Sequence, residues 1–170
     1  MSAKLKDEIR QGKPFSSPAQ EAFLNLQRTA DALMRGLEET LKPSGLTQTQ
    51  YNVLRILRGA GASGLLCREV SERMVTREPD MTRLLDRLET RGLVTRSRDR
   101  KDRRAITVRI TGPGVELLAR LDDAVAERHM RQLAHLGNAR IRSLIGLLET
   151  AREEVETPSN QQYTLGGGKR

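Results

Sequence analysis

The sequence predicts a mainly α-helical fold with a small β-hairpin, and three observations support this prediction. Apolar residues recur at spacings of three and four along most of the chain, which is the helical period. The period changes to two within residues 93–110, which is typical of paired strands. Gly and Pro residues separate the periodic segments. The length of 170 residues suits one domain with long flanking helices and is too short for two full domains.

The first half of the chain predicts two substantial helices. Residues 1–18 are polar, are interrupted by Gly and Pro, and are expected to form a flexible arm. A long helix is expected over residues 19–41, with one apolar stripe formed by Phe23, Leu26, Ala30, Leu33, Leu37 and Leu41. A second helix is expected to begin after Thr47, because Thr47 and Gln50 have the spacing of a capping box. Its predicted buried residues are Tyr51, Val53, Leu54 and Leu57.

Two shorter helices and a hairpin are expected next. A third helix carries Leu66, Val70 and Met74 at intervals of four. The fourth helix is expected to hold Pro79 in its first turn and to end at Gly92. Residues 93–96 and 106–110 have strand patterns, and residues 97–104 between them include no apolar side chain. These segments predict a hairpin with a charged, protruding tip.

The last part of the chain predicts two more helices. Thr111 is expected to cap the fifth helix, with Pro113 in its first turn. Its expected stripe is Val115, Leu118, Leu121, Val125 and Met130. The sixth helix is expected from about residue 139, with Ile141, Leu144, Ile145, Leu148 and Val155 as its apolar residues. Residues 157–170 are polar and are expected to be disordered.

Basic charge is concentrated in the middle of the chain. The sequence has 30 Lys and Arg against 22 Asp and Glu, a net charge of +8. Residues 68–109 carry 13 basic and eight acidic side chains, whereas residues 110–170 carry eight of each. Residues 91–104 alone carry seven basic and two acidic groups. Such a local excess is typical of a surface that binds a polyanion.

The order of helices followed by a hairpin with a basic tip is that of a winged helix-turn-helix. In this arrangement the fourth helix enters the major groove of DNA, and the hairpin, or wing, reaches the neighbouring backbone or minor groove. Asp102 is expected to stabilise the wing by holding a neighbouring arginine. The predicted DNA-binding residues are Arg77, Asp80, Thr82, Arg83, Arg87, Arg98, Arg100, Lys101, Arg103 and Arg104. Among them, Arg83 is the favoured base reader, and Arg87 could equally be part of a solvated helix face.

Other function classes find little support in the sequence. It contains no phosphate-binding Gly-rich loop, nucleophile elbow or zinc-protease motif, so no enzyme, catalytic residue or cofactor is expected. Cys67 is the only cysteine, and His129 and His135 lie six residues apart, so no metal site is expected. Cys67 is interpreted as a small apolar residue, although a redox role stays open. No apolar run is long enough to span a membrane, and a cytoplasmic location is expected.

A resemblance to a known family rests mainly on residues 81–111. The run MTRLLDRLE followed by RGLVTR resembles the recognition helix and first wing strand of MarR-type regulators. DRRA, then VRIT and Gly114, resembles the wing signature and the start of the next helix. The resemblance extends over roughly residues 20–155. It implies a homodimer built from the first, fifth and sixth helices, regulation of nearby genes, and often a small aromatic effector that releases DNA.

The resemblance completes the expected organisation. Residues 19–45 form a dimerisation helix, residues 46–111 the winged helix-turn-helix DNA-binding domain, and residues 112–156 the remaining dimerisation helices. The apolar stripes at both ends support dimerisation independently, because they would be exposed unless they pack against each other within the monomer or against a second chain. Tyr51 lies in a region that lines the ligand pocket of similar proteins, although a core role is equally open. The expected function is a homodimeric, ligand-responsive repressor of palindromic operators. The alternatives are a nonspecific architectural DNA-binding protein and a metal-sensing winged-helix regulator.

Overall fold

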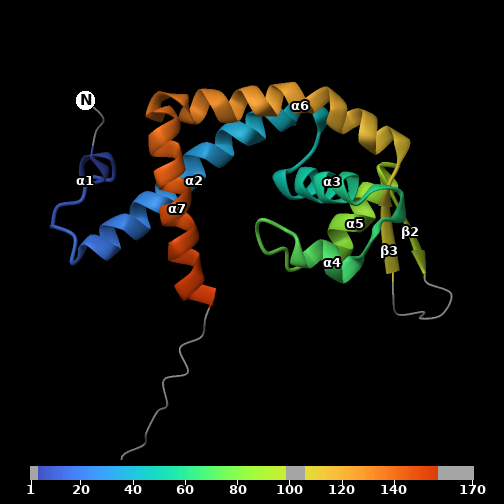
Figure 1. Ribbon diagram of the computed structural model, residues 1–170, viewed down its shortest axis with the longest axis horizontal. Coiled ribbons are helices and arrows are strands. Elements are labelled where there is room, and N and C mark those ends of the chain that lie inside the picture. The colour runs from blue at the N-terminus through green and yellow to red at the C-terminus, as the bar shows by residue number, and fades with distance from the viewer. Residues whose placement is uncertain (1–3, 99–105, 157–170) are drawn as a thin grey trace, which may run out of the picture. The chain divides into compact units, whose positions relative to one another are not determined.

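The computed structural model describes residues 4–98 and 106–156, which form seven α-helices and three short β-strands (Figure 1). The chain divides into two compact units, Met1–His129 and Met130–Arg170. Within the described residues, no helix is both long enough and apolar enough to cross a membrane. The mainly helical fold with a small β wing is confirmed.

The first unit begins with two helices. The segment expected to be an arm contains the four-residue helix α1 (Leu5–Glu8), on which Leu5 is buried. Helix α2 (Pro18–Leu41) begins beside Ser17, whose Oγ accepts a hydrogen bond from the backbone N–H of Gln20 at 3.1 Å. A 3-10 turn (Lys42–Ser44) follows α2, and Gly45 ends it with a left-handed φ of 65°.

Helix α3 (Gln48–Ala60) confirms the predicted capping box. The Thr47 hydroxyl accepts from the backbone N–H of Gln50 at 3.2 Å, and the Gln50 side chain accepts from the backbone N–H of Thr47 at 3.0 Å. All four side chains predicted for its buried face are buried. The helix continues through Gly59 to Ala60, and its C-cap is Gly61 with a positive φ.

The helix-turn-helix continues with α4 (Cys67–Glu72) and α5 (Met81–Thr90). The prediction that Pro79 lies in the first turn of the fourth helix is wrong. The Asp80 carboxylate accepts from the backbone N–H of Arg83 at 3.0 Å, so Asp80 is the N-cap and the helix begins at Met81. A carboxylate at this position satisfies a free N–H and interacts favourably with the helix dipole.

The wing is a three-stranded antiparallel sheet rather than the two-stranded hairpin expected. Its strands β1 (Leu65–Leu66), β2 (Val94–Arg98) and β3 (Ile106–Ile110) lie in the order β1-β3-β2. Strand β1 was missed because two residues are too few to show a period of two. Gly64 precedes β1 with φ at 70°, and a Cβ there would lie 2.4 Å from the carbonyl oxygen of Val108. This close approach requires glycine.

The core of the first unit joins α3, α5, the sheet and α6 (Gly112–Leu133). The Thr111 hydroxyl accepts from the backbone N–H of Gly114 at 3.2 Å, which confirms Thr111 as the cap of α6. Arg58 of α3 forms two hydrogen bonds to the Asp122 carboxylate of α6, at 2.7 and 2.8 Å. Fully buried side chains in this core are Leu41, Leu54, Leu57, Leu85, Leu88, Leu118, Val53, Val70, Val94 and Val108.

Three of the predicted apolar stripes are only partly buried in the chain. Leu118, Leu121 and Val125 of α6 are buried, whereas Val115 and Met130 are exposed. On α2, burial increases from an exposed Phe23 to a fully buried Leu41. The second unit contains the end of α6, a 3-10 turn (Ala134–Leu136) and α7 (Gly137–Glu156). On α7, Ile141, Leu144 and Leu148 are half-buried, and Ile145 and Leu147 are exposed.

Candidate nucleic-acid interface

Helix α5 separates apolar and polar residues completely. Met81, Leu84, Leu85 and Leu88 are buried in the core, which fixes the rotation of the helix about its own axis. The same rotation exposes Thr82, Arg83, Asp86 and Arg87 on the opposite face. A helix held in this way by its apolar side presents a rigid polar surface, as reading of the major groove requires.

The two arginines of α5 are available for an external ligand. Arg83 and Arg87 are four residues apart and both are exposed. Among the described residues, neither guanidinium forms an ion pair or hydrogen bond. The possibility that Arg83 pairs with an acid of its own helix is therefore not realised, because Asp80 bonds only its backbone N–H. Arg77, which precedes the helix, is also exposed and lacks a partner within the described part of the chain.

The wing carries the second group of predicted contacts. Strands β2 and β3 pair from Val94 opposite Ile110 to Arg98 opposite Ile106. Arg98 is exposed at the end of β2. The remaining predicted wing residues lie outside the described residues, so their roles stay predictions: Arg100, Lys101, Asp102, Arg103 and Arg104.

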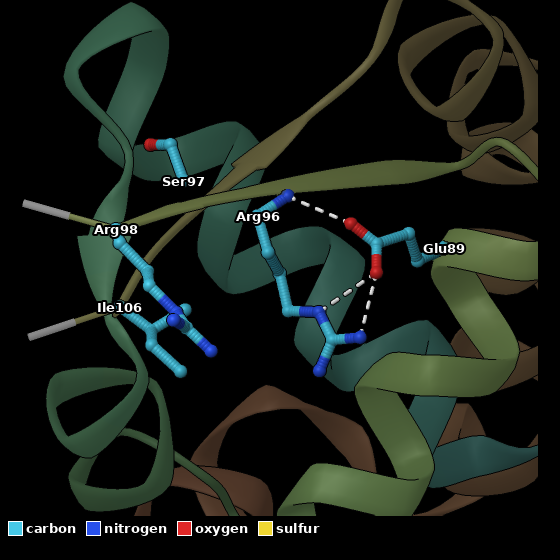
Figure 2. Close-up of a pocket in the computed structure, with 5 residues that line it drawn as sticks. All are labelled: Glu89, Arg96, Ser97, Arg98 and Ile106. Atoms are coloured by element: carbon cyan, nitrogen blue, oxygen red, sulfur yellow. Dashed lines mark hydrogen bonds and ion pairs between the residues drawn. The ribbon is translucent and has the colours of Figure 1, made fainter. Parts of the chain in front are cut away.

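The structure adds an ion-pair cluster that sequence reasoning missed. Arg96 of β2 points at α5, where the Glu89 carboxylate accepts from its backbone N–H at 3.0 Å, its Nε at 2.9 Å and its Nη2 at 2.6 Å (Figure 2). Arg96 Nη2 also lies 2.6 Å from Asp86 Oδ1. Hydrogen bonds from Arg96 lower the pKa of Glu89, and the same bonds raise the pKa of Arg96. The sequence signal that could have identified this cluster is strand register. Arg96 lies two residues from buried Val94 and therefore faces the same side of the sheet.

Two further contacts fix the end of α5. The Arg91 guanidinium donates to the carbonyl oxygens of Gly45 at 2.8 Å and Ser44 at 2.9 Å, next to the turn that ends α2. The Thr111 hydroxyl donates to the carbonyl oxygen of Gly92 at 2.7 Å. Both contacts satisfy backbone carbonyls that have no helical partner. They connect the end of α5 to α2 on one side and to α6 on the other.

Tyr51 is both a core residue and a cavity wall. Its side chain is 6% exposed, and burial raises the pKa of its hydroxyl. It lines a cavity of about 230 Å³ together with Met34, Leu37, Gln48, Asn52, Arg55, Val75, Thr76 and His129. The Arg55 guanidinium lies 5.9 Å from the centre of the Tyr51 ring. The cavity therefore combines apolar walls with one cation at its edge.

Cys67 and the histidines give no sign of redox or metal chemistry. Cys67 is half-buried at the start of α4, and burial raises the pKa of its thiol. A raised pKa reduces the thiolate fraction on which reactivity depends. No group of three or more His, Cys, Asp or Glu side chains suited to a metal ion occurs in the described ranges.

Comparison with known proteins identifies the family. A profile of the MarR family matches residues 44–105. A protein of Thauera aromatica assigned to transcriptional regulation of the hcr operon is 32% identical over 146 residues, which cover 85% of this chain and 87% of that protein. The crystal structure of a MarR transcription factor from Planctomyces limnophilus is 40% identical, with a TM-score of 0.63, and covers 81% of this chain and 99% of that one.

A structure with bound nucleic acid shares the fold. A MarR mutant from E. coli, solved in complex with operator DNA, has a TM-score of 0.69 and 23% identity, and covers 88% of this chain and 99% of that one. At this identity the match concerns the fold alone, whereas the two closer matches carry the family assignment. The chain belongs to the MarR family of winged helix-turn-helix, DNA-binding transcriptional regulators, which are not enzymes.

Proposed function

We propose that this protein is a homodimeric repressor that binds a palindromic operator and releases it when a small effector binds. One observation carries the proposal: Arg83 and Arg87 lie exposed and unpartnered, as far as the described residues show, on a helix whose opposite face is buried. Arginine presents paired donors that match the O6 and N7 acceptors of guanine. The arrangement therefore suits reading of a major groove.

The predicted DNA-binding residues divide into base readers, backbone contacts and supporting residues. Arg83, with Arg87 beside it, reads base edges, and Thr82 donates to a phosphate near the start of α5. Arg77 contacts the backbone just before the helix. Asp80 acts indirectly, because its carboxylate caps the helix that carries Arg83. Arg98 and the wing-tip residues Arg100, Lys101, Arg103 and Arg104 bind phosphates or the minor groove, and Asp102 orders that tip.

Exposed apolar residues support the dimer. Phe23 and Leu26 of α2 are 59% and 45% exposed, and Leu147 of α7 is 70% exposed. Apolar side chains gathered on helices outside the DNA-binding domain need a partner surface, and a second copy of the chain supplies one. A two-fold dimer places two copies of α5 on one face, which is why the operator is expected to be palindromic.

The cavity beside Tyr51 supports a small aromatic effector. Its walls are mainly apolar, and Arg55 at its edge offers a positive charge to an anionic or phenolic group. The cavity touches α2, α3 and the segment before α5, so a bound ligand would act on the elements that position the recognition helix. Binding to chromosomal DNA implies action in the cytoplasm.

Selection of bound sequences from random duplexes tests the proposal. A specific regulator enriches one palindrome and binds it at least about a thousandfold more tightly than random DNA at physiological salt. Enrichment of no sequence, with tight binding to every duplex, would indicate an architectural protein instead. Zinc-dependent binding would indicate the metal sensor.

A further inference from the structure

The acidic residues of α5 pose a problem for a helix that binds DNA. Helix α5 carries two arginines, Arg83 and Arg87, and two carboxylates, Asp86 and Glu89, so the helix itself is electrically neutral. Both carboxylates would repel phosphate if they were free. The structure shows that neither is free, since both contact Arg96.

Arg96 is placed to hold the wing rather than DNA. Its side chain is 24% exposed, and its Nε and Nη2 atoms are already engaged by carboxylates. Arg98 is the opposite case, because it is exposed on the same strand and has no partner among the residues that the structure describes. In Figure 2 the Arg96 guanidinium lies against Glu89. Both residues line a cavity of about 280 Å³ together with Ser97, Arg98 and Ile106.

The contact also involves backbone atoms. Glu89 accepts from the backbone N–H of Arg96 as well as from its side chain, so one carboxylate is hydrogen-bonded to the strand at two points. Three hydrogen bonds to one carboxylate fix both distance and orientation, which a single ion pair does not. Glu89 belongs to the recognition helix, and Arg96 belongs to the wing. The hydrogen bonds between Glu89 and Arg96 therefore constrain the relative position of helix and wing, in addition to the core packing that both elements share.

We propose that Arg96 is a positioning residue: through Glu89 and Asp86 it fixes the wing against the recognition helix and neutralises the helix acids, and it does not contact DNA itself. This proposal rests on the proposed DNA-binding function of α5 and the wing. According to the proposal, this ion-pair cluster increases the affinity for DNA although none of its residues contacts a phosphate. Glu89, an acid, is then required for binding a polyanion.

This requirement for Glu89 can be tested, because the proposal and simple electrostatics predict opposite changes in DNA affinity when Glu89 is removed. Glu89→Ala removes a negative charge from the DNA side of the molecule, so electrostatics alone predicts tighter binding. The proposal predicts weaker binding, by about two- to hundredfold, the range of coupling within one hydrogen-bond network. The slope of log affinity against log salt should also become shallower, by roughly 0.9 for each phosphate that the displaced wing no longer contacts.

The measurement is fluorescence anisotropy of the full chain with its selected duplex at several salt concentrations. Glu116→Ala is the matched control, because Glu116 is an exposed acid on α6 that has no partner within the described ranges. Glu89→Gln keeps the shape of the side chain and one acceptor oxygen, removes the charge, should fold as the parent does, and should lose less affinity than Glu89→Ala. Arg96→Lys keeps the charge but lacks the planar guanidinium that donates from both Nε and Nη2, so it too should weaken binding.

Each outcome bears on the proposal. Weaker binding with a shallower salt slope in both Glu89 variants supports it. Tighter binding with a steeper slope would mean that freed Arg96 contacts phosphate directly, and it would overturn the proposal. Unchanged affinity with a lower melting temperature would reduce the cluster to a stabilising role and would overturn it equally. Failure of the parent protein to bind any duplex would contradict the proposed function instead, which keeps the two failures distinct.

Discussion

Replacing Arg83 by alanine is expected to weaken binding to the selected operator and to leave binding to random DNA nearly unchanged. The Arg83 side chain is exposed in the first turn of α5, and its loss leaves no buried group without a partner. The free energy of unfolding should therefore change by no more than about 0.5 kcal/mol. Loss of a base contact should cost about 1–3 kcal/mol of binding, or roughly 5- to 150-fold in affinity.

Arg98 offers a matched control for Arg83. It is also exposed, also unpartnered within the described residues, and lies on the wing instead of the helix. Arg98→Ala should weaken binding to operator and random DNA by the same factor, because phosphates carry no base identity. It should also flatten the salt slope by roughly 0.9, the effect of one phosphate contact. Arg104→Ala is predicted to behave in the same way.

The assay compares anisotropy titrations of operator and scrambled duplexes between about 50 and 200 mM salt, the range over which phosphate contacts are most visible. Circular dichroism and thermal melting confirm that each variant keeps the parent fold. Equal losses on both duplexes for Arg83→Ala would refute its assignment as a base reader and make it a phosphate contact. Base reading would then have to come from Arg77, Asp80 and Thr82 at the head of α5.

Three further predictions concern stability and assembly. Gly64→Ala should lower the free energy of unfolding by about 1–3 kcal/mol in urea titrations, because its Cβ would collide with the carbonyl of Val108; an unchanged midpoint would contradict this close approach. The hydrogen bond from Arg58 lowers the pKa of Asp122 in the folded state. The ionised carboxylate therefore stabilises the fold at pH values above its unfolded pKa of about 3.9. This stabilisation is lost as the pH falls through the lowered pKa of the folded state. Asp122→Asn should therefore destabilise at neutral pH and lose less stability on acidification than the parent; equal acid sensitivity would count against the pair. Leu144→Asp should convert the proposed dimer into 19.1 kDa chains and abolish operator binding, whereas an operator-binding dimer in sedimentation would exclude α7 from the interface.

Local chemistry made the helices predictable from sequence. The Thr47–Gln50 capping box and the Thr111 cap depend on residues three apart, and the structure contains both. Apolar spacing likewise identified the four buried apolar side chains of α3. The start of α5 was misplaced because Pro79 and Asp80 both signal a helix start, and only the hydrogen bond from the Arg83 backbone decides between them.

Long-range pairings were the part that the sequence could not supply. Strand β1 exists only because Leu65 pairs with Val108, a residue far along the chain. Arg91 was unremarked in the sequence because its partners are the carbonyls of Ser44 and Gly45, which no side-chain pattern identifies. The Arg96 cluster was missed for a related reason, because Arg96 lies on β2 and its partners Asp86 and Glu89 lie on α5.

In the DNA-binding domain, the described acids have bonding partners, whereas several exposed arginines have none among the described residues. The six acids among residues 68–98 all have partners within the domain: Glu69 accepts from the backbone N–H of Leu66, Glu72 pairs with Arg68, Glu78 and Asp80 accept from backbone N–H groups, and Asp86 and Glu89 hold Arg96. Arg77, Arg83, Arg87 and Arg98 have none in the same range. Bonds within the domain thus hold the acids in place and leave these four guanidinium groups to the solvent. Among the described residues, no carboxylate pairs with these four cations, so a phosphate backbone approaching α5 and the wing would meet their charge directly.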